Sequence, residues 1–290
     1  MFKGSLPALV TPFRDGAIDE AAYAALIERQ IAAGAHGLVP CGTTGEASAL
    51  SHAEHTRAIS LCVETARGRV PVIAGVGGGL YEGVVARMAH AKAVGADAAL
   101  VVTPYYVRPS QDGLFAYFSA LNKAVALPMV AYNVPSRTGV DMSVETVGRI
   151  AALPSVIGLK DATGDLSRVA RHLRLVPSGF ALLSGDDPSA VGFIAHGGVG
   201  CISVTANVAP EPMARLLDLA FAGDFDEARA LDQTLARLHR ALFLDASPSP
   251  AKRALALLGL CEDGVRLPLV ALGTRLDEEL KAAMAEAGVA

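Results

Sequence analysis

Short apolar runs alternate along the chain with longer segments in which apolar and polar residues recur at helical spacing. The runs are continuous in apolar character, as expected for parallel strands that helices cover on both faces. Their spacing of about 30 residues or less is the length of a strand–helix unit with short loops. Eight such runs occur, at residues 6–11, 37–41, 70–75, 98–103, 128–133, 156–160, 180–185 and 200–204.

The segments between the runs carry helix-boundary signals. Asp19 is positioned to begin one helix, and Gly34 lies where that helix should end. Ser51 and Glu54 have the spacing of a capping box, in which each side chain bonds the other residue's backbone amide. Gly95 marks a further helix end. Eight strands, each followed by a helix, predict an α/β fold of the closed (β/α)8 TIM-barrel type.

The chain continues well beyond the eighth run. We expect residues 1–209 to form the barrel that carries the active site, and residues 210–290 to form a C-terminal helical extension packed on it. No linker rich in proline, glycine and serine separates the two parts as independent domains. Helical patterns in the extension cover residues 210–222, 225–243, 250–258 and 276–287.

Composition narrows the class of protein. Hydrophobic residues make up 52% of the chain and charged residues 19%, which is enough apolar material for a large core. A net charge of -4 does not favour binding to nucleic acid or to an anionic membrane surface. No apolar run has the length of a membrane span, no secretory signal pattern is present, and no Cys-x-x-Cys pair occurs. We expect a cytoplasmic protein.

A lysine, Lys160, closes the apolar run at residues 156–160. An ammonium in such a position costs solvation free energy unless it is paired or loses its proton. A neutral amine can attack a carbonyl and form a Schiff base. Most strand-end lysines simply reach solvent, so the interpretation depends on which residues end neighbouring strands, since that face of a (β/α)8 barrel holds the active site.

The second run is followed by the turn Gly42-Thr43-Thr44-Gly45-Glu46. Two glycines around two hydroxyl side chains make a tight turn whose amides can point at one anion, and its size suits a carboxylate. A purely structural turn is an equally good interpretation of this motif alone.

The fifth run ends at Tyr132, where a phenol can relay protons to a nearby Schiff base. Arg137 follows in a loop between Pro135 and Gly139 and can bind a carboxylate through two hydrogen bonds. The ordinary alternatives are a tyrosine that caps the core and an arginine that faces solvent.

Weaker candidates lie at other strand ends. Tyr105 and Tyr106 can donate hydroxyls at the mouth of a site or pack against another subunit. Backbone groups near Gly185 and Ile202 leave room for a ligand. A histidine pair in one predicted helix lacks further ligands of suitable spacing, so we do not expect a metal site.

These motifs resemble the 4-hydroxy-tetrahydrodipicolinate synthases, also called dihydrodipicolinate synthases. That family belongs to the pyruvate-dependent class I aldolase, or N-acetylneuraminate lyase, superfamily. The resemblance covers nearly the whole chain. The threonine turn and the Tyr132–Lys160 pair mark the superfamily, whereas residues 132–139, with Arg137, are more specific to the synthases.

The resemblance implies a role for each candidate. Lys160 would form an imine with pyruvate, whose carboxylate Thr43 and Thr44 would hold. Tyr132 would move protons, linked through Thr44 to Tyr106. In the family the tyrosine matching Tyr106 enters from the neighbouring subunit, so a homotetramer built from two dimers is expected.

The second substrate is implied in the same way. The enamine would add to L-aspartate 4-semialdehyde, whose carboxylate Arg137 would anchor, in the diaminopimelate route to L-lysine. Backbone groups near Gly185 and Ile202 would line the pyruvate pocket. The resemblance implies a carbon–carbon condensing lyase with no metal or organic cofactor, because the imine itself is the electron sink.

One departure from the family concerns feedback control. Lysine-inhibited members use an asparagine and a glutamate where this chain has Gly79 and Gly83, whereas His52, His55 and Tyr105 match other parts of that pocket. A lysine ligand would lose a charge partner and an amide, which predicts weak or absent inhibition.

Two alternatives stay open. A pyruvate-forming aldolase or dehydratase acting on a 2-keto-3-deoxy sugar acid would keep Lys160, Tyr132 and the threonine turn without needing Arg137. A catalytically silent relative that binds pyruvate or acts as a scaffold would be expected to lose the lysine, the tyrosine or the threonines, and all are present.

Overall fold

The structure is a computed structural model that describes residues 2–289. Its main sheet has seven strands in the order β1-β9-β8-β7-β6-β5-β4, and every neighbouring pair runs parallel. The strands are β1 (Gly4–Pro7), β4 (Ile73–Gly75), β5 (Ala98–Val102), β6 (Met129–Asn133), β7 (Val156–Asp161), β8 (Ala181–Ser184) and β9 (Gly200–Ser203).

The second predicted strand closes the barrel between β1 and β4, but only by two isolated bridges. Val39 pairs with Ala8 on one side, and Leu38 pairs with Val72 on the other. The ladder is short because Cys41, just beyond it, has a φ of 54° and turns the chain out of the extended conformation. The (β/α)8 barrel is therefore confirmed, although most of its strands are shorter than the predicted runs.

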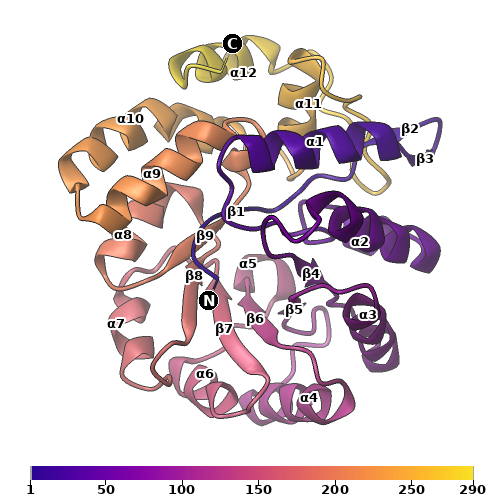
Figure 1. The fold of residues 1–290 in the computed structure, drawn as a ribbon, viewed down its shortest axis with the longest axis vertical. Helices are drawn as coiled ribbons and strands as arrows, with labels where there is room; N and C mark the ends of the chain where they lie inside the picture. Colours follow the sequence, from indigo (N-terminus) through magenta and orange to yellow (C-terminus); the bar gives the residue numbers. More distant parts are fainter. Residues whose placement is uncertain (1, 290) are drawn as a thin grey trace.

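Helices ring the strands, as Figure 1 shows. Both predicted N-termini are confirmed: the Asp19 side chain accepts a hydrogen bond from Ala22 N at 3.0 Å, and Ser51 and Glu54 form the capping box. Such caps each stabilise a helix by about 1 kcal/mol. The ring comprises α1 (Glu20–Ala32), α2 (His52–Ala66), α3 (Tyr81–Ala93), α4 (Gln111–Ala124), α5 (Pro135–Thr138), α6 (Val144–Ala151), α7 (Ser167–Leu173) and α8 (Ala190–Ala195).

The C-terminal segment is helical, as predicted, and Figure 1 shows it along one edge of the barrel. A small antiparallel hairpin, β2 (Phe13–Arg14) with β3 (Ala17–Ile18), was not expected from the sequence. Across residues 2–289, no helix has both the length and the apolar character needed to cross a membrane. The C-terminal helices are α9 (Pro210–Ala222), α10 (Phe225–Ala241), α11 (Ser249–Leu257) and α12 (Asp277–Glu286).

The strands take part in three apolar clusters, one of which joins strand residues such as Leu159 to residues of the surrounding helices such as Phe118. The barrel interior is filled by strand side chains, among them Leu100, Tyr132 and Ile202, so the barrel is packed rather than hollow. A separate apolar cluster joins Cys201 of β9 to Leu216 and to α10–α12. The boundary at residue 209 stays a prediction, since α9 beyond it shares this cluster with the barrel.

Candidate active site

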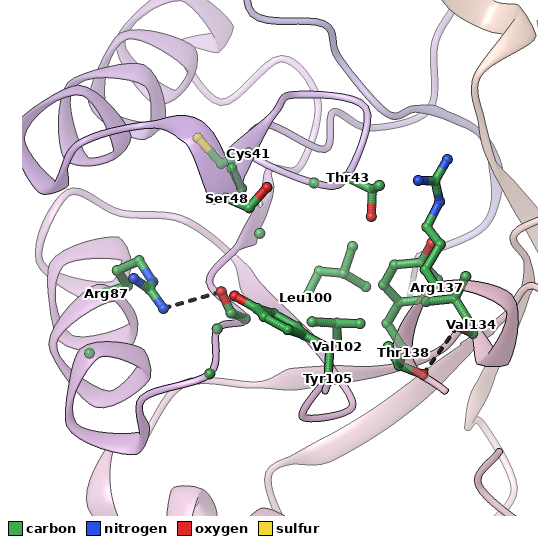
Figure 2. A pocket seen from close by; sticks show the side chains of 18 of the residues that line it. Cys41, Thr43, Ser48, Arg87, Leu100, Val102, Tyr105, Val134, Arg137 and Thr138 are labelled. Carbon is green, nitrogen blue, oxygen red and sulfur yellow. Dashed lines mark hydrogen bonds between the residues drawn. The ribbon is translucent and has the colours of Figure 1, made fainter. Parts of the chain in front are cut away.

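A cavity of about 460 Å³ opens beside the carboxyl ends of β4, β5 and β6. Figure 2 shows the side chains that line it. Six of the lining residues were singled out from the sequence, three for catalysis or substrate binding and three for a possible effector site. They are Thr43, Tyr132 and Arg137, and Gly79, Gly83 and Tyr105.

Lys160 and Tyr132 meet at the ends of adjacent strands. Their Cα atoms are partners in the β6–β7 register, and the Lys160 amine lies 4.3 Å from the centroid of the Tyr132 ring. Both side chains are buried, each residue being 6% exposed. The amine is therefore held over an aromatic face with little access to water. The tyrosine–lysine pair predicted from the sequence is brought together in the structure.

Gly185 leaves space for this amine. A Cβ atom at position 185 would lie 2.8 Å from Cε of Lys160 and 2.7 Å from Cβ of Ala162. The Gly185 amide donates to the Asp161 carbonyl at 2.7 Å, and this hydrogen bond holds the backbone at Gly185 close to the Lys160 side chain. Ile202, at 1% exposure, packs in the barrel interior with Tyr132.

The threonine turn presents unused backbone donors. Cys41 and Glu46, at its two ends, both have a φ of 54°, a left-handed conformation that non-glycine residues keep only when neighbours hold it. The Glu46 amide donates to the Thr43 carbonyl at 3.0 Å and closes the turn. Within residues 2–289, the amides of Thr43 and Thr44 donate to no protein acceptor. These two amides are free to bind an anion.

Two guanidinium groups lie at opposite ends of the cavity in Figure 2. Arg137 extends from α5, whose C-cap residue Gly139 has a φ of 73°, and it has no ion-pair partner in the described part of the chain. Arg87, on α3, donates to the Val76 carbonyl at 2.9 Å and to the Gly77 carbonyl at 3.1 Å. Nothing in the sequence pattern distinguishes Arg87 from a surface helix residue, so it was missed.

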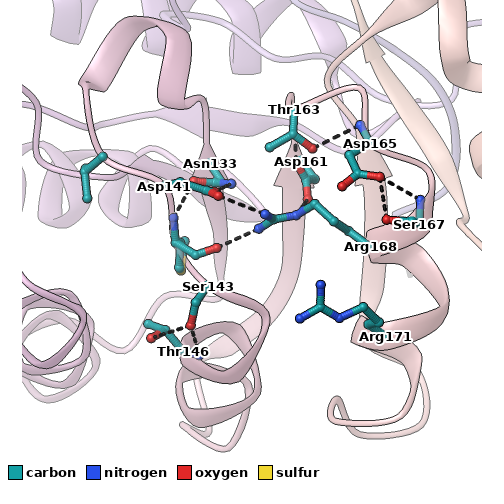
Figure 3. Close-up of polar contacts among 12 residues, drawn as sticks. Asn133, Asp141, Ser143, Thr146, Asp161, Thr163, Asp165, Ser167, Arg168 and Arg171 are labelled. Atoms are coloured by element: carbon teal, nitrogen blue, oxygen red, sulfur yellow. Dashed lines mark hydrogen bonds and ion pairs between the residues drawn. The ribbon is translucent and has the colours of Figure 1, made fainter.

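A polar network fixes the strand ends that carry Tyr132 and Lys160 (Figure 3). Asn133 donates to Asp141 at 2.8 Å, and Arg168 pairs with Asp141 at 2.9 Å. Arg168 also donates to Asp161 at 3.1 Å. The residue that follows each candidate catalytic residue thus connects its strand end to Arg168. Asn133 follows Tyr132 and reaches Arg168 through Asp141, whereas Asp161 follows Lys160 and binds Arg168 directly.

The Asp161 carboxylate in this network is buried, at 4% exposure. Burial alone would raise its pKa, but the His172 ring, whose Nε2 lies 3.4 Å from the carboxylate, the hydrogen bond from Thr163 and the charge of Arg168 bring the pKa below its ordinary value. Asp161 is therefore ionised and accepts hydrogen bonds behind Lys160. Its only sequence signal is that it is a carboxylate directly after the strand-end lysine.

Seven predicted site residues are not part of the cavity lining: Lys160, Thr44, Gly185, Ile202, Tyr106, His52 and His55. Tyr106 is 91% exposed, with a φ of 72°. His52 is exposed on α2, and His55 is buried at 3% exposure. Burial and the charge of Arg87 lower the pKa of His55 to about 4. Within residues 2–289, no group of three or more His, Cys, Asp or Glu side chains is placed to hold a metal ion.

Together, these groups can bind and activate a small oxo acid. The free amides of Thr43 and Thr44 can take a carboxylate, while Lys160 can attack a neighbouring carbonyl and the Tyr132 hydroxyl can carry protons. Arg137 adds a place for a second carboxylate at the rim of the cavity.

Comparisons with known proteins agree with this chemistry. The model of the dihydrodipicolinate synthetase family matches residues 1–287. The chain is 60% identical over 292 residues to the 4-hydroxy-tetrahydrodipicolinate synthase of Hyphomonas neptunium, covering 100% of this chain and 99% of that protein.

Solved structures give the same result. The dihydrodipicolinate synthase from Acinetobacter baumannii complexed with pyruvate has a TM-score of 0.97 at 42% identity, covering 100% of both chains. A monomeric dihydrodipicolinate synthase variant has a TM-score of 0.97 at 36% identity, covering 100% of this chain and 98% of that one. By its sequence throughout and by its fold, the chain belongs to the dihydrodipicolinate synthetase family.

Proposed function

We propose that the chain is a 4-hydroxy-tetrahydrodipicolinate synthase, which condenses pyruvate with L-aspartate 4-semialdehyde. The observation that carries the proposal is the buried Lys160 amine, 4.3 Å from the Tyr132 ring centroid, at the strand ends beside a cavity lined by Thr43 and Arg137. The names of the relatives at high identity support the same reaction.

The first half of the reaction forms an enamine. The Lys160 amine attacks the ketone carbon of pyruvate, and water leaves to give an imine. The amides of Thr43 and Thr44 bind the carboxylate and fix the carbonyl beside the amine, a positioning effect that accounts for much of the rate gain. Transfer of a methyl proton, through the hydroxyl of Tyr132, converts the imine to the enamine.

The second half makes the carbon–carbon bond. The enamine carbon attacks the aldehyde of L-aspartate 4-semialdehyde, and Tyr132 returns a proton to the new alkoxide. Arg137 anchors the carboxylate of this substrate. The substrate's own amine then attacks the imine carbon, closes the ring and releases Lys160 unchanged. The imine nitrogen accepts the electron pair throughout, so the route needs no metal or organic cofactor.

Assembly would complete the proton path. Tyr106 at 91% exposure, Val107 at 70% and Leu80 at 66% expose large apolar surfaces near the cavity. Such exposed side chains are typical of a subunit interface. We propose that a second subunit supplies its Tyr106 to this site and receives this one in return, within a homotetramer of two dimers.

A coupled assay tests the function. Pyruvate, L-aspartate 4-semialdehyde and a dihydrodipicolinate reductase are mixed with the protein, and the loss of NADPH is followed. Turnover is expected, and borohydride with pyruvate should add a reduced adduct to Lys160 that mass spectrometry can locate. Trapping without turnover, together with cleavage of keto-deoxy sugar acids, would assign the protein to the sugar-acid aldolases instead.

A further inference from the structure

A buried ion pair joins the C-terminal segment to the threonine turn. Nζ of Lys252, on α11, lies 2.6 Å from Oε1 of Glu46, and both side chains are 0% exposed. The two residues are 206 positions apart in the sequence. Glu46 is the last residue of the turn that holds Thr43 and Thr44.

Both carboxylate oxygens of Glu46 are bound by this segment. Lys252 donates to Oε1, and the backbone amide of Arg266 donates to Oε2 at 2.9 Å. Lys252 also donates to the Gly264 carbonyl at 2.6 Å, and its ammonium lies 4.0 Å from the centroid of the Phe13 ring. The pair is thus surrounded by partners that suit its charges.

Stability alone is a poor reason for such a pair. Taking a carboxylate and an ammonium out of water costs about as much free energy as their attraction returns, and apolar residues of the same volume often serve as well. A buried pair does fix geometry, because either charge left without its partner is strongly unfavourable. The role of the Lys252–Glu46 pair should therefore lie in the segment of the chain whose geometry it fixes.

That part is the backbone of the turn. Glu46 is left-handed, with a φ of 54°, and its amide closes the turn on the Thr43 carbonyl. A non-glycine residue keeps this conformation only when its surroundings impose it. Lys252 and Arg266 hold its side chain, so they also hold the direction in which the Thr43 and Thr44 amides point.

We propose that Lys252 is a positioning residue of the pyruvate site, which acts through Glu46 to keep the Thr43–Thr44 amides aimed at the substrate carboxylate. This inference rests on the proposed function. It makes the C-terminal extension part of the apparatus that binds pyruvate, although no side chain of the extension needs to touch the substrate.

The test compares Lys252→Met with Arg253→Met. Arg253 is the next residue on α11, and it pairs with Asp277 and Asp263, whereas within residues 2–289 it forms no ion pair or hydrogen bond with Glu46. Loss of a binding interaction that is equally present in the ground and transition states raises KM, so Lys252→Met should raise the KM for pyruvate about tenfold. Arg253→Met should lower the Tm while leaving that KM within about twofold of wild type.

Two further variants keep the test decisive. The double variant Glu46→Gln/Lys252→Met removes both charges and leaves no buried charge unpaired, so it should fold and still show the raised KM for pyruvate. Lys252→Arg keeps the cation and should restore most of the affinity. The KM for L-aspartate 4-semialdehyde should change little in every variant.

Borohydride trapping on Lys160 against pyruvate concentration measures the same affinity without the second substrate. It separates failure of this inference from failure of the proposed function, because trapping by the wild-type protein does not depend on which aldehyde is used. If trapping by the double variant depended on pyruvate concentration in the same way as trapping by the wild-type protein, the proposal would be overturned. Failure of every Lys252 variant to fold would make the pair a folding element and overturn it as well.

Discussion

Tyr132 and Lys160 are direct neighbours across the β6–β7 ladder, and the lysine amine lies over the tyrosine ring, 4.3 Å from its centroid. The ring thus shapes the space around the amine, while the hydroxyl serves proton transfer. These two contributions of one side chain can be separated by removing the oxygen alone.

Tyr132→Phe should lower kcat by about 100-fold or more, the usual size of a general acid–base contribution. The remaining ring keeps the packing against Lys160, so borohydride should still trap pyruvate there. Single-turnover trapping and steady-state kinetics together check this. A variant with normal kcat would remove Tyr132 from the proton path.

Arg137→Ala should impair the reaction with L-aspartate 4-semialdehyde and leave imine formation with pyruvate unchanged. Loss of a bidentate guanidinium–carboxylate contact should lower kcat/KM for L-aspartate 4-semialdehyde by about 100-fold, with pyruvate trapping unchanged. Arg149→Ala is the matched control, because Arg149 is a surface arginine paired with Asp112. Equal losses for pyruvate and for the aldehyde would contradict the assignment of Arg137 as a carboxylate clamp.

Gly185→Ala should abolish imine formation. The added Cβ would lie 2.8 Å from Cε of Lys160, closer than real contacts allow, so the amine must move. Gly83→Ala is the control at the other end of the cavity, where an added Cβ meets nothing nearer than 3.8 Å. The extent of borohydride trapping distinguishes the two, and normal trapping in Gly185→Ala would show that the strand end can adjust.

Acid should destabilise the protein through His55. Its pKa is about 4 in the folded chain against an ordinary value of 6.5, so the unfolded chain binds more protons between these values. The stability linked to neutral His55 is present above the unfolded pKa and is lost as the pH falls from 6.5 towards 4. Thermal unfolding at several pH values should show a shallower decline for His55→Leu than for wild type. His52→Leu, at an exposed position, should follow the wild-type curve.

L-Lysine should inhibit weakly or not at all. Gly79 and Gly83 line the end of the cavity near Arg87, whose guanidinium lies within 3.9 Å of the position that a Cβ on Gly83 would take. The cationic ligand would meet a cation at a position where the family resemblance implies a glutamate in lysine-inhibited members. Inhibition should be weak because a contact between like charges without a counterion is unfavourable. Initial rates measured with L-lysine up to about 10 mM check this prediction. An inhibition constant below about 1 mM would contradict it.

The sequence predicted the ends of the strands better than their lengths. Apolar runs identify buried strands because both faces must be apolar in a parallel barrel, and Lys160, Tyr132 and the threonine turn lie at those ends. The run at residues 37–41 pairs only through Leu38 and Val39, because the left-handed Cys41 ends it. That conformation depends on tertiary packing and leaves no local signal.

The supporting residues were harder to predict than the reacting ones. Arg87 and Lys252 lie on helices whose local pattern is that of ordinary amphipathic helices. The Glu46 partner of Lys252 is also 206 positions away in the chain. Asp161 and Asn133 are different, since each directly follows a reacting residue. A search for polar residues one position beyond the strand ends would have found the network around Arg168.

The contact between Glu46 and Lys252 also sets an order of events during synthesis. The threonine turn leaves the ribosome about 200 residues before its anchor, since 206 positions separate the two. A nascent chain that has already paired every barrel strand still lacks the cation that fixes the turn. Under the proposed role of Lys252, competence to bind pyruvate is therefore acquired only after α11 has been synthesised.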